Sequence, residues 1–382
     1  MALNITRIAS RTLAGLTLAG SLFASAAYAQ PATGEPIKIG AILSLSGPGA
    51  GLGQPERSGI LLAEKAINDR GGIKGRPIKI LIEDDGSKPD IAKSKAERLI
   101  FDEKVVAMVG PSLTASTGAV SAITNAEGMA QMTFTGLGPK IELTYKSLFH
   151  VLPPQALNAH AMLEYTTKEA KAKRIGVLHD TGYGQVILNS LNAIYKDYGV
   201  EFVAIEKFEV GASDATAQAA KVRAANPEVV FVLATSPVPF RNARQIKIEQ
   251  PIIAAVGSAS YDYVRGIGEF ADNIVFAEFV VGEDPKPEQA EFVAAFKNAY
   301  NALPKTFEAA GWDAVQIVAK GIEKAGVDAS RKDIAAAIRG PHKGAMAEYD
   351  FSKDDMTGIA LPSYVYSKVT KGQFTRLPFT AK

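Results

Sequence analysis

Small hydroxyl residues follow the third predicted strand of this chain, in the segment Gly110-Pro111-Ser112-Leu113-Thr114. A helix is expected to begin here, and the first N–H groups of a helix have no partner within it and lie at the positive end of its dipole. With the hydroxyl of Thr114, these N–H groups could hold a carboxylate without a charged side chain. A structural alternative is that Ser112 caps the helix. The segment is therefore a candidate anion site.

A second candidate follows the first predicted strand, where Ser46–Pro55 contains glycines at positions 47, 49, 51 and 53. A glycine-rich loop that opens a helix commonly cradles a small anion. The glycines miss the G-x-G-x-x-G spacing of a dinucleotide site, and the Walker pattern is absent. A nucleotide enzyme is not indicated.

The sequence shows no arrangement of side chains that is suited to covalent catalysis or to metal binding. The chain has no cysteine, and the G-x-S-x-G elbow of the α/β-hydrolases is absent. The four histidines (His150, His160, His179, His342) have no metal-ligand spacing. We therefore expect a binding protein rather than an enzyme, with no cofactor and no bound metal.

The first residues have the pattern of a secretory signal. Arg7 and Arg11 precede an apolar run over 13–23, and the small residues that follow end in Ala27-Tyr28-Ala29. We expect cleavage after Ala29, a signal peptide over 1–29 and a periplasmic product that is not itself embedded in the membrane. The alternative, a membrane anchor, would need about 20 unbroken apolar residues. Cleavage would reduce the 42 Lys and Arg residues to 40, against 40 Asp and Glu, and this neutral balance argues against nucleic acid.

Apolar strands and helices alternate along the rest of the chain. Strands are expected over 37–45, 78–82, 105–109 and 131–134, and helices over 56–70 (with Pro55 at its first position), around 92–99 and over 112–126. The pattern restarts with strands at 174–179, 202–205, 229–234, 252–256 and 274–279 and helices from 156, 185, 215 and 240. Mostly helix follows to about 339, and strand-like segments end the chain around 347–351 and 364–369.

Nearly continuous apolar strands separated by helices indicate parallel sheets covered on both faces. Two runs of this kind predict an α/β protein with two doubly wound parallel-sheet lobes. Ligands of such sheets bind beyond the carboxyl ends of the strands, where the candidate segments lie.

The chain resembles the periplasmic leucine/isoleucine/valine-type binding proteins of ABC transporters, which have the type I two-lobe fold. The resemblance extends over residues 36–380. Its motifs are Ser46-Gly47-Pro48, Ile67-Asn68, 71–76 (GGIKGR), Glu83-Asp84-Asp85, 105–112, His179-Asp180 and Tyr183-Gly184. The resemblance implies a cleft that closes over one small molecule and three hinge crossovers, expected near 152–154, 276–280 and 357–362. It implies lobes over 36–152 plus 279–358 and over 153–278 plus 359–382.

The resemblance also implies positions for the site. Thr135, Gly136 and Leu137 match a second segment that holds the ligand's polar groups, where Leu137 could offer only its N–H. The ring of Tyr183 matches one that closes over the ligand, although a loop tyrosine on the surface is the alternative. Leu52 and Phe307 match positions that pack on the ligand, although Phe307 could equally belong to a helix core. Thr235, Ser258 and Ala259 end second-lobe strands and are expected to complete the wall of the cleft. Asp180 is expected to end its strand or cap the next helix rather than to bind the ligand.

One departure from the family bears on the ligand. Amino-acid binders of this family place a carboxylate near Ala259 to pair with the ligand's ammonium, whereas here the nearest acid is Asp262. Burying an unpaired ammonium is unfavourable by several kcal/mol. We therefore expect an aromatic, branched or 2-oxo monocarboxylate, which is also what the resemblance of the Ser46–Pro55 loop to the aromatic-carboxylate-binding branch implies.

The expected function is capture of this acid by a monomeric solute-binding protein and delivery to an ABC transporter permease in the inner membrane. Two alternatives remain open at this point: a branched-chain amino-acid binding protein of the same fold, and a ligand-sensing receptor subunit.

Overall fold

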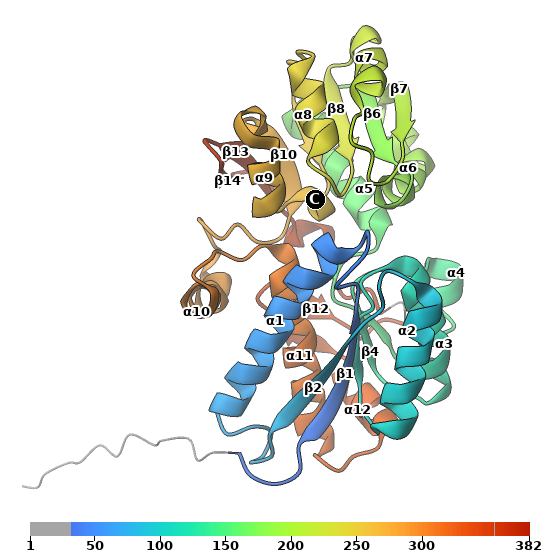
Figure 1. Ribbon diagram of the computed structural model, residues 1–382, viewed down its shortest axis with the longest axis vertical. Coiled ribbons are helices and arrows are strands. Elements are labelled where there is room, and N and C mark those ends of the chain that lie inside the picture. Colours follow the sequence, from blue (N-terminus) through green and yellow to red (C-terminus); the bar gives the residue numbers. More distant parts are fainter. Residues whose placement is uncertain (1–31, 355) are drawn as a thin grey trace, which may run out of the picture.

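The computed structural model describes residues 32–354 and 356–382, and it contains two large β-sheets (Figure 1). The expected signal peptide and its cleavage site lie outside the described residues. Among the residues that are described, no helix is long and apolar enough to span a membrane.

The first sheet has five strands in the order β2-β1-β3-β4-β5, and all of its neighbouring strands are parallel. Its strands are β1 (Ile37–Leu43), β2 (Ile78–Asp84), β3 (Met108–Val109), β4 (Gln131–Thr133) and β5 (Leu148–His150). Its helices are α1 (Ala50–Asp69), α2 (Pro89–Glu97), α3 (Thr114–Ala126), α4 (Pro139–Glu142), α11 (Thr306–Ala325) and α12 (Arg331–Ile338). The pair α1 and α11 covers one face and the pair α2 and α3 the other (Figure 1).

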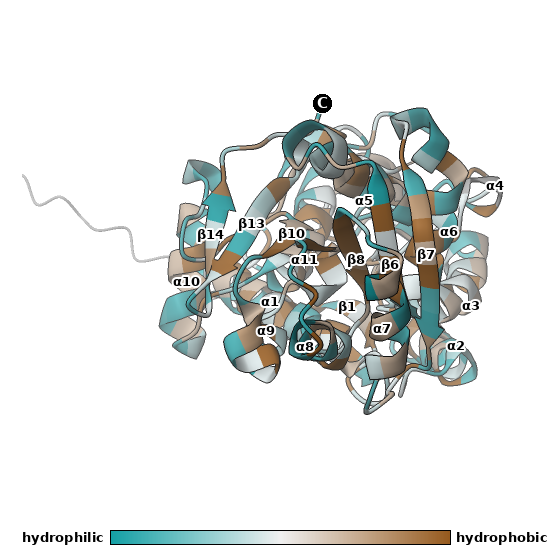
Figure 2. Cartoon of the chain, turned by 90° about the horizontal axis from the view of Figure 1, so that it is seen from above, coloured by the Kyte–Doolittle hydropathy of each residue, from teal (hydrophilic) through white to brown (hydrophobic). Residues whose placement is uncertain are grey.

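The second sheet has seven strands in the order β14-β13-β10-β9-β8-β6-β7. Its strands are β6 (Arg174–Asp180), β7 (Glu201–Phe208), β8 (Val229–Leu233), β9 (Ile252–Ala254), β10 (Ile274–Glu278), β13 (Val365–Thr370) and β14 (Gln373–Leu377). The helices of this half are α5 (Gln155–Glu164), α6 (Tyr183–Ile194), α7 (Thr216–Ala224), α8 (Val238–Gln245) and α9 (Tyr261–Ile267). Strand β8 is buried throughout and apolar along its length (Figure 2), as expected for a strand covered on both faces.

One edge of the second sheet departs from the parallel arrangement expected there. Strand β13 pairs antiparallel with both β10 and β14. Lys371 and Gly372 connect β13 to β14 and both have positive φ (51° and 75°). Two such residues form the tight turn that joins antiparallel neighbours, so this hairpin cannot be parallel.

Several element boundaries also differ from the expectation. Helix α1 begins at Ala50, so only the second half of the glycine-rich segment belongs to the helix, and Pro55 lies inside the helix rather than at its first position. The short elements α4 and β5 were not predicted, nor was β14. A further small hairpin joins β11 (Pro341–Lys343) to β12 (Glu348–Asp350), and α10 (Ala290–Tyr300) lies outside both sheets.

The chain passes between the two halves three times: after β5, after β10 and between β12 and β13. We propose lobe boundaries in these passages, with residues 36–152 and 279–358 in the first lobe and 153–278 and 359–382 in the second. A buried ion pair lies at the second passage, where Lys305 Nζ at the start of α11 is 2.6 Å from Glu278 Oε2 at the end of β10.

Candidate functional site

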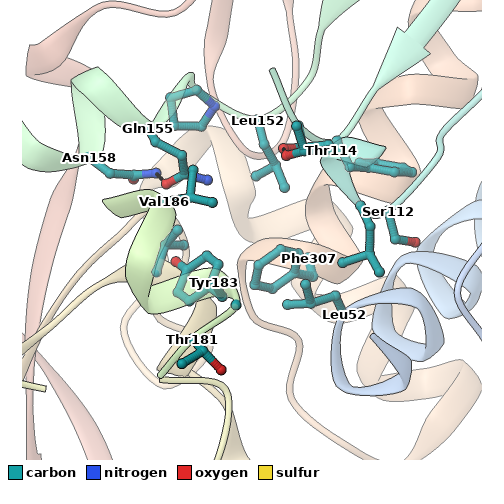
Figure 3. Close-up of a pocket in the computed structure, with 16 residues that line it drawn as sticks. Leu52, Ser112, Thr114, Leu152, Gln155, Asn158, Thr181, Tyr183, Val186 and Phe307 are labelled. Carbon is teal, nitrogen blue, oxygen red and sulfur yellow. Dashed lines mark hydrogen bonds between the residues drawn. The ribbon is translucent and has the colours of Figure 1, made fainter. Parts of the chain in front are cut away.

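A cavity of about 350 Å³ lies where the carboxyl ends of strands from both sheets meet (Figure 3). This volume is within the range of small-molecule sites. Residues from both halves line it: Leu52, Ser112, Leu113, Thr114, Phe134, Thr135, Leu152, Pro153, Gln155, Asn158, Thr181, Gly182, Tyr183, Val186, Val256 and Phe307.

The structure brings most of the predicted site residues together at this cavity. Those that line it are Leu52, Ser112, Leu113, Thr114, Thr135, Tyr183 and Phe307. Gly136 and Leu137 line an adjoining cavity of about 530 Å³, which shares Thr114, Gln155 and Val186 with the first. Ala259 lines a third cavity, of about 590 Å³, on the other side of Phe307. Thr235 and Ser258 do not line the 350 Å³ cavity.

Three polar groups of predicted site residues form hydrogen bonds within the protein. The Leu137 N–H donates to the carboxylate of Glu142 rather than pointing into the cavity. The hydroxyl of Ser258 donates to the carbonyl of Ala234, and the side chain is buried. At Thr235, the backbone N–H donates to Asp180 Oδ2 over 3.2 Å. These three groups therefore bond within the protein, and contact of Leu137, Thr235 and Ser258 with a ligand stays a prediction.

Asp180 organises the loop that carries Tyr183. Its Oδ1 accepts hydrogen bonds from the N–H groups of Gly182 (2.9 Å) and Gly184 (2.8 Å). These bonds satisfy donors at the start of α6, which is the capping role expected from the sequence. The hydroxyl of Tyr183 in turn accepts a hydrogen bond from the Gly257 N–H over 2.8 Å. Burial raises the pKa of Tyr183, so the hydroxyl remains protonated.

Ser112 does not cap helix α3, whose N-cap is Leu113 with no side-chain hydrogen bond. Its hydroxyl accepts a hydrogen bond from the Ser44 N–H over 3.1 Å and donates to Glu56 Oε2. Ser44 also donates its hydroxyl to Asp85 Oδ1 over 2.8 Å. Ser112 thus joins the first turn of α3 to a buried polar network behind the cavity.

Glu56 is the innermost member of that network and is fully buried in α1. Burial raises its pKa well above the ordinary value, an effect opposed by the Ser112 hydroxyl and reinforced by the nearby charge of Asp85. Burial therefore favours the protonated form of this carboxyl, and that form does not repel an anion held at the start of α3.

Thr114 and Thr135 present two hydroxyls on one side of the cavity, with their Oγ1 atoms 2.9 Å apart. Thr114 is the first residue of α3, so unpaired N–H groups of the first helical turn lie beside its hydroxyl. These groups can donate several hydrogen bonds to one small anion. The arrangement agrees with the chemistry expected from the sequence at this position.

The rest of the lining is mainly apolar. Leu52 from α1, Phe307 from α11 and Val186 from α6 contribute to it together with the ring of Tyr183 (Figure 3). None of the sixteen lining residues carries an acidic or a basic side chain. The cavity therefore offers hydrogen-bond donors and apolar surface, but no formal charge.

The sequence prediction missed Gln155 and Asn158, which lie on the first turn of α5. Asn158 Nδ2 donates to Gln155 Oε1 over 2.7 Å, as the dashed line in Figure 3 shows. The sequence signal for Gln155 was its place directly after Pro153-Pro154, in the expected first crossover. It was overlooked because the three-residue strand β5 before that crossover was not predicted.

Glu142 and His150 lie close together beside the adjoining cavity. Glu142 Oε1 accepts N–H groups of Leu137 and Gly138 and lies 3.3 Å from His150 Nε2. Burial alone would raise the pKa of Glu142, but the contacts with His150 and the two N–H groups lower it, so the carboxyl is ionised. A Cβ on Gly136 would meet Glu142 Oε1 at 2.8 Å, so a larger residue there would displace this carboxylate. In residues 32–354 and 356–382, no three His, Asp or Glu side chains gather in a way that could hold a metal ion.

Known proteins resemble this chain over most of its length. Residues 36–372 match the family described as periplasmic binding protein. The Leu/Ile/Val-binding protein homolog 3 of Brucella melitensis is 28% identical over 319 residues, which cover 82% of this chain and 84% of the relative. The leucine-, isoleucine-, valine-, threonine-, and alanine-binding protein of Pseudomonas aeruginosa is 26% identical over 335 residues, covering 83% and 89%. The crystal structure of a periplasmic binding protein type 1 from Bordetella pertussis matches with a TM-score of 0.79 at 26% identity, covering 90% of this chain and 100% of that chain.

Proposed function

The chain belongs to the type I periplasmic binding proteins of ABC transporters, and we propose that it captures a small monocarboxylate without an amine, such as an aromatic, branched or 2-oxo acid. In this proposal the carboxylate lies against the start of α3, where Thr114 and Thr135 donate to it. The apolar part of the acid lies between Leu52, Tyr183 and Phe307. The protein performs no reaction on its ligand.

The observation that carries the proposal is the uncharged lining of the 350 Å³ cavity. A carboxylate can be held there by helix N–H groups and hydroxyls. An ammonium would find no carboxylate among the sixteen lining residues, and an unpaired buried ammonium is unfavourable. Burial raises the pKa of Glu56 behind the site, which favours its uncharged form and so lessens repulsion of an anion.

Delivery follows from closure of the two lobes. Because residues of both halves line the cavity, a ligand that contacts both stabilises the closed arrangement and shifts the population toward it. The closed form would then dock, as a monomer in the periplasm, on a permease of the inner membrane. In a variant of this proposal, the same closure serves to sense the ligand, and the closed form docks on a regulator instead of a permease.

A second candidate is binding of branched-chain amino acids, for which the relatives from Brucella melitensis and Pseudomonas aeruginosa are named. Glu142 is the acidic residue that could pair with the ammonium of an amino acid, because it lines the adjoining cavity and its carboxylate is ionised. Its carboxylate is already engaged by two N–H groups and His150, which makes it a poor partner for an ammonium.

Thermal-shift and calorimetric titration with benzoate, phenylpyruvate, leucine and valine test the proposal. We expect stabilisation by at least one of the two acids, and a loss of about 10- to 100-fold in its affinity in Thr114→Ala, because a hydrogen bond to a charged group is removed. The folded state of the variant should remain intact. Stabilisation by leucine or valine alone would support the second candidate, and unchanged affinity in Thr114→Ala would refute the carboxylate position.

A further inference from the structure

Gln155 occupies a junction in the site. It lines the 350 Å³ cavity and the adjoining 530 Å³ cavity, and it shares this position with Thr114 and Val186. It is the first residue of α5, directly after Pro153-Pro154. Its side chain therefore lies in the lining that the two cavities share, as does Thr114.

A buried hydrogen-bond relay fixes the amide of Gln155. The hydroxyl of Tyr364 donates to Asn158 Oδ1, and Asn158 Nδ2 donates to Gln155 Oε1 over 2.7 Å. Asn158 and Tyr364 are 2% and 1% exposed, so water does not compete for these bonds. With its oxygen engaged, Gln155 has its NH2 group left for the cavity (Figure 3).

The tyrosine determines the direction of the relay. In each of the two amides, the oxygen and the NH2 group could exchange places without a change of shape. Gln155 would then present its oxygen to the cavity instead. Burial raises the pKa of Tyr364, so its hydroxyl keeps its hydrogen. Asn158 is the partner that the described hydrogen bonds give this hydroxyl. A reversed relay would leave the buried O–H without that acceptor, which is unfavourable.

We propose that Gln155 is a specificity-determining residue, whose amide donates a hydrogen bond to a second, uncharged oxygen beside the ligand's carboxylate. This inference rests on the proposed function, because Thr114 must hold the carboxylate. An N–H donor at the 2-position accommodates an oxo or hydroxyl oxygen and disfavours an ammonium, which has no acceptor to offer. The site would therefore prefer 2-oxo and 2-hydroxy acids to the matching 2-amino acids and to acids with an unsubstituted 2-carbon.

Calorimetric titration with acids of one carbon skeleton tests this proposal. The two series are phenylpyruvate, phenylalanine and 3-phenylpropanoate, and 4-methyl-2-oxopentanoate, leucine and 4-methylpentanoate. In Gln155→Met, which keeps the length but removes the NH2 group, we expect affinity for the preferred 2-oxo acid to fall about tenfold, the value of one neutral hydrogen bond. Affinity for the unsubstituted acid should not change. Tyr364→Phe should narrow the preference for 2-oxo over 2-amino acids, since the relay can then reverse.

Asn189→Leu is the matched control. Asn189 carries an exposed amide that lines the 530 Å³ cavity but not the 350 Å³ cavity, and it takes no part in the relay. It should bind like the wild type, and circular dichroism verifies the fold of each variant. Equal wild-type affinity for 2-oxo and unsubstituted acids, unchanged in Gln155→Met, would refute the role of Gln155 and leave the proposed function standing. Tighter binding of the 2-amino acids, abolished by Gln155→Met, would mean that the relay runs in the opposite direction. Failure of every acid to bind the wild type would refute the proposed function itself.

Discussion

Glu56 is a buried carboxyl whose ionisation is altered by the fold of this site. Its pKa is raised above the ordinary 4.5, chiefly by burial, so the folded protein keeps a proton that the unfolded chain releases. Stability from this group is fully present below about pH 4.5 and decreases as the pH rises toward the folded pKa. At higher pH, therefore, burial of Glu56 lowers the free energy of unfolding.

Replacing Glu56 by glutamine should remove this pH dependence. The amide is neutral and of similar shape, so the free energy of unfolding of Glu56→Gln, relative to wild type, should increase from pH 5 to pH 8. Denaturant unfolding at the two pH values measures the difference. A relative stability that stays constant with pH would show that Glu56 titrates normally.

Residue-scale roles could be predicted from the sequence where they depend on local structure. Thr114 was identified because it follows a strand and begins a helix, and Tyr183 because it matches a family position whose ring closes over the ligand; both line the 350 Å³ cavity. Gln155 also begins a helix, but it was missed because strand β5 before it was not predicted. Its orientation depends on Tyr364, which bonds Asn158 across 206 positions of the sequence.

At the scale of elements, α1 and α11 set the width of the cavity. Leu52 lies on α1 and Phe307 on α11, and the two helices pack through glycines. A Cβ on Gly311 would lie 2.2 Å from the carbonyl oxygen of Glu56, so the helices would have to separate to accept it.

Gly311→Ala should therefore reduce both stability and ligand affinity. We expect a loss of about 1–3 kcal/mol in the free energy of unfolding, which is typical of an overpacked core. Gly118→Ala is the control, because its added Cβ meets its nearest neighbour, Leu137 Cδ2, at an ordinary 3.5 Å. Equal stability of the two variants would contradict close packing of α1 against α11.

Strands that are long, apolar and followed by helices were predicted well from the sequence. Strand β8, with five buried residues, is an example. Strand β5 was not predicted, whereas β4 and β9, which also have three residues, were found within the predicted segments 131–134 and 252–256. The β13–β14 hairpin was missed because its turn, Lys371-Gly372, was not interpreted as a two-residue connection.

On the scale of the whole molecule, the two sheets are joined near the site by the buried pair Lys305–Glu278. Lys305 Nζ also lies 3.4 Å from the ring centroid of Phe374, next to the second sheet's edge. Removal of one member would leave a buried charge without its partner. Because Phe307 is two residues beyond Lys305, we infer that this pair helps to fix Phe307 relative to both sheets.

The central claim is that two lobes close over an acid that has no amine, and a competition experiment tests it most directly. Protein freed of bound ligand by unfolding and refolding is incubated with equal concentrations of phenylpyruvate, benzoate, leucine and valine, and native mass spectrometry identifies the species that remains bound. We expect the mass of one acid without an amine, at one molecule per monomer. A bound leucine or valine, or protein that retains none of the four, would contradict the claim.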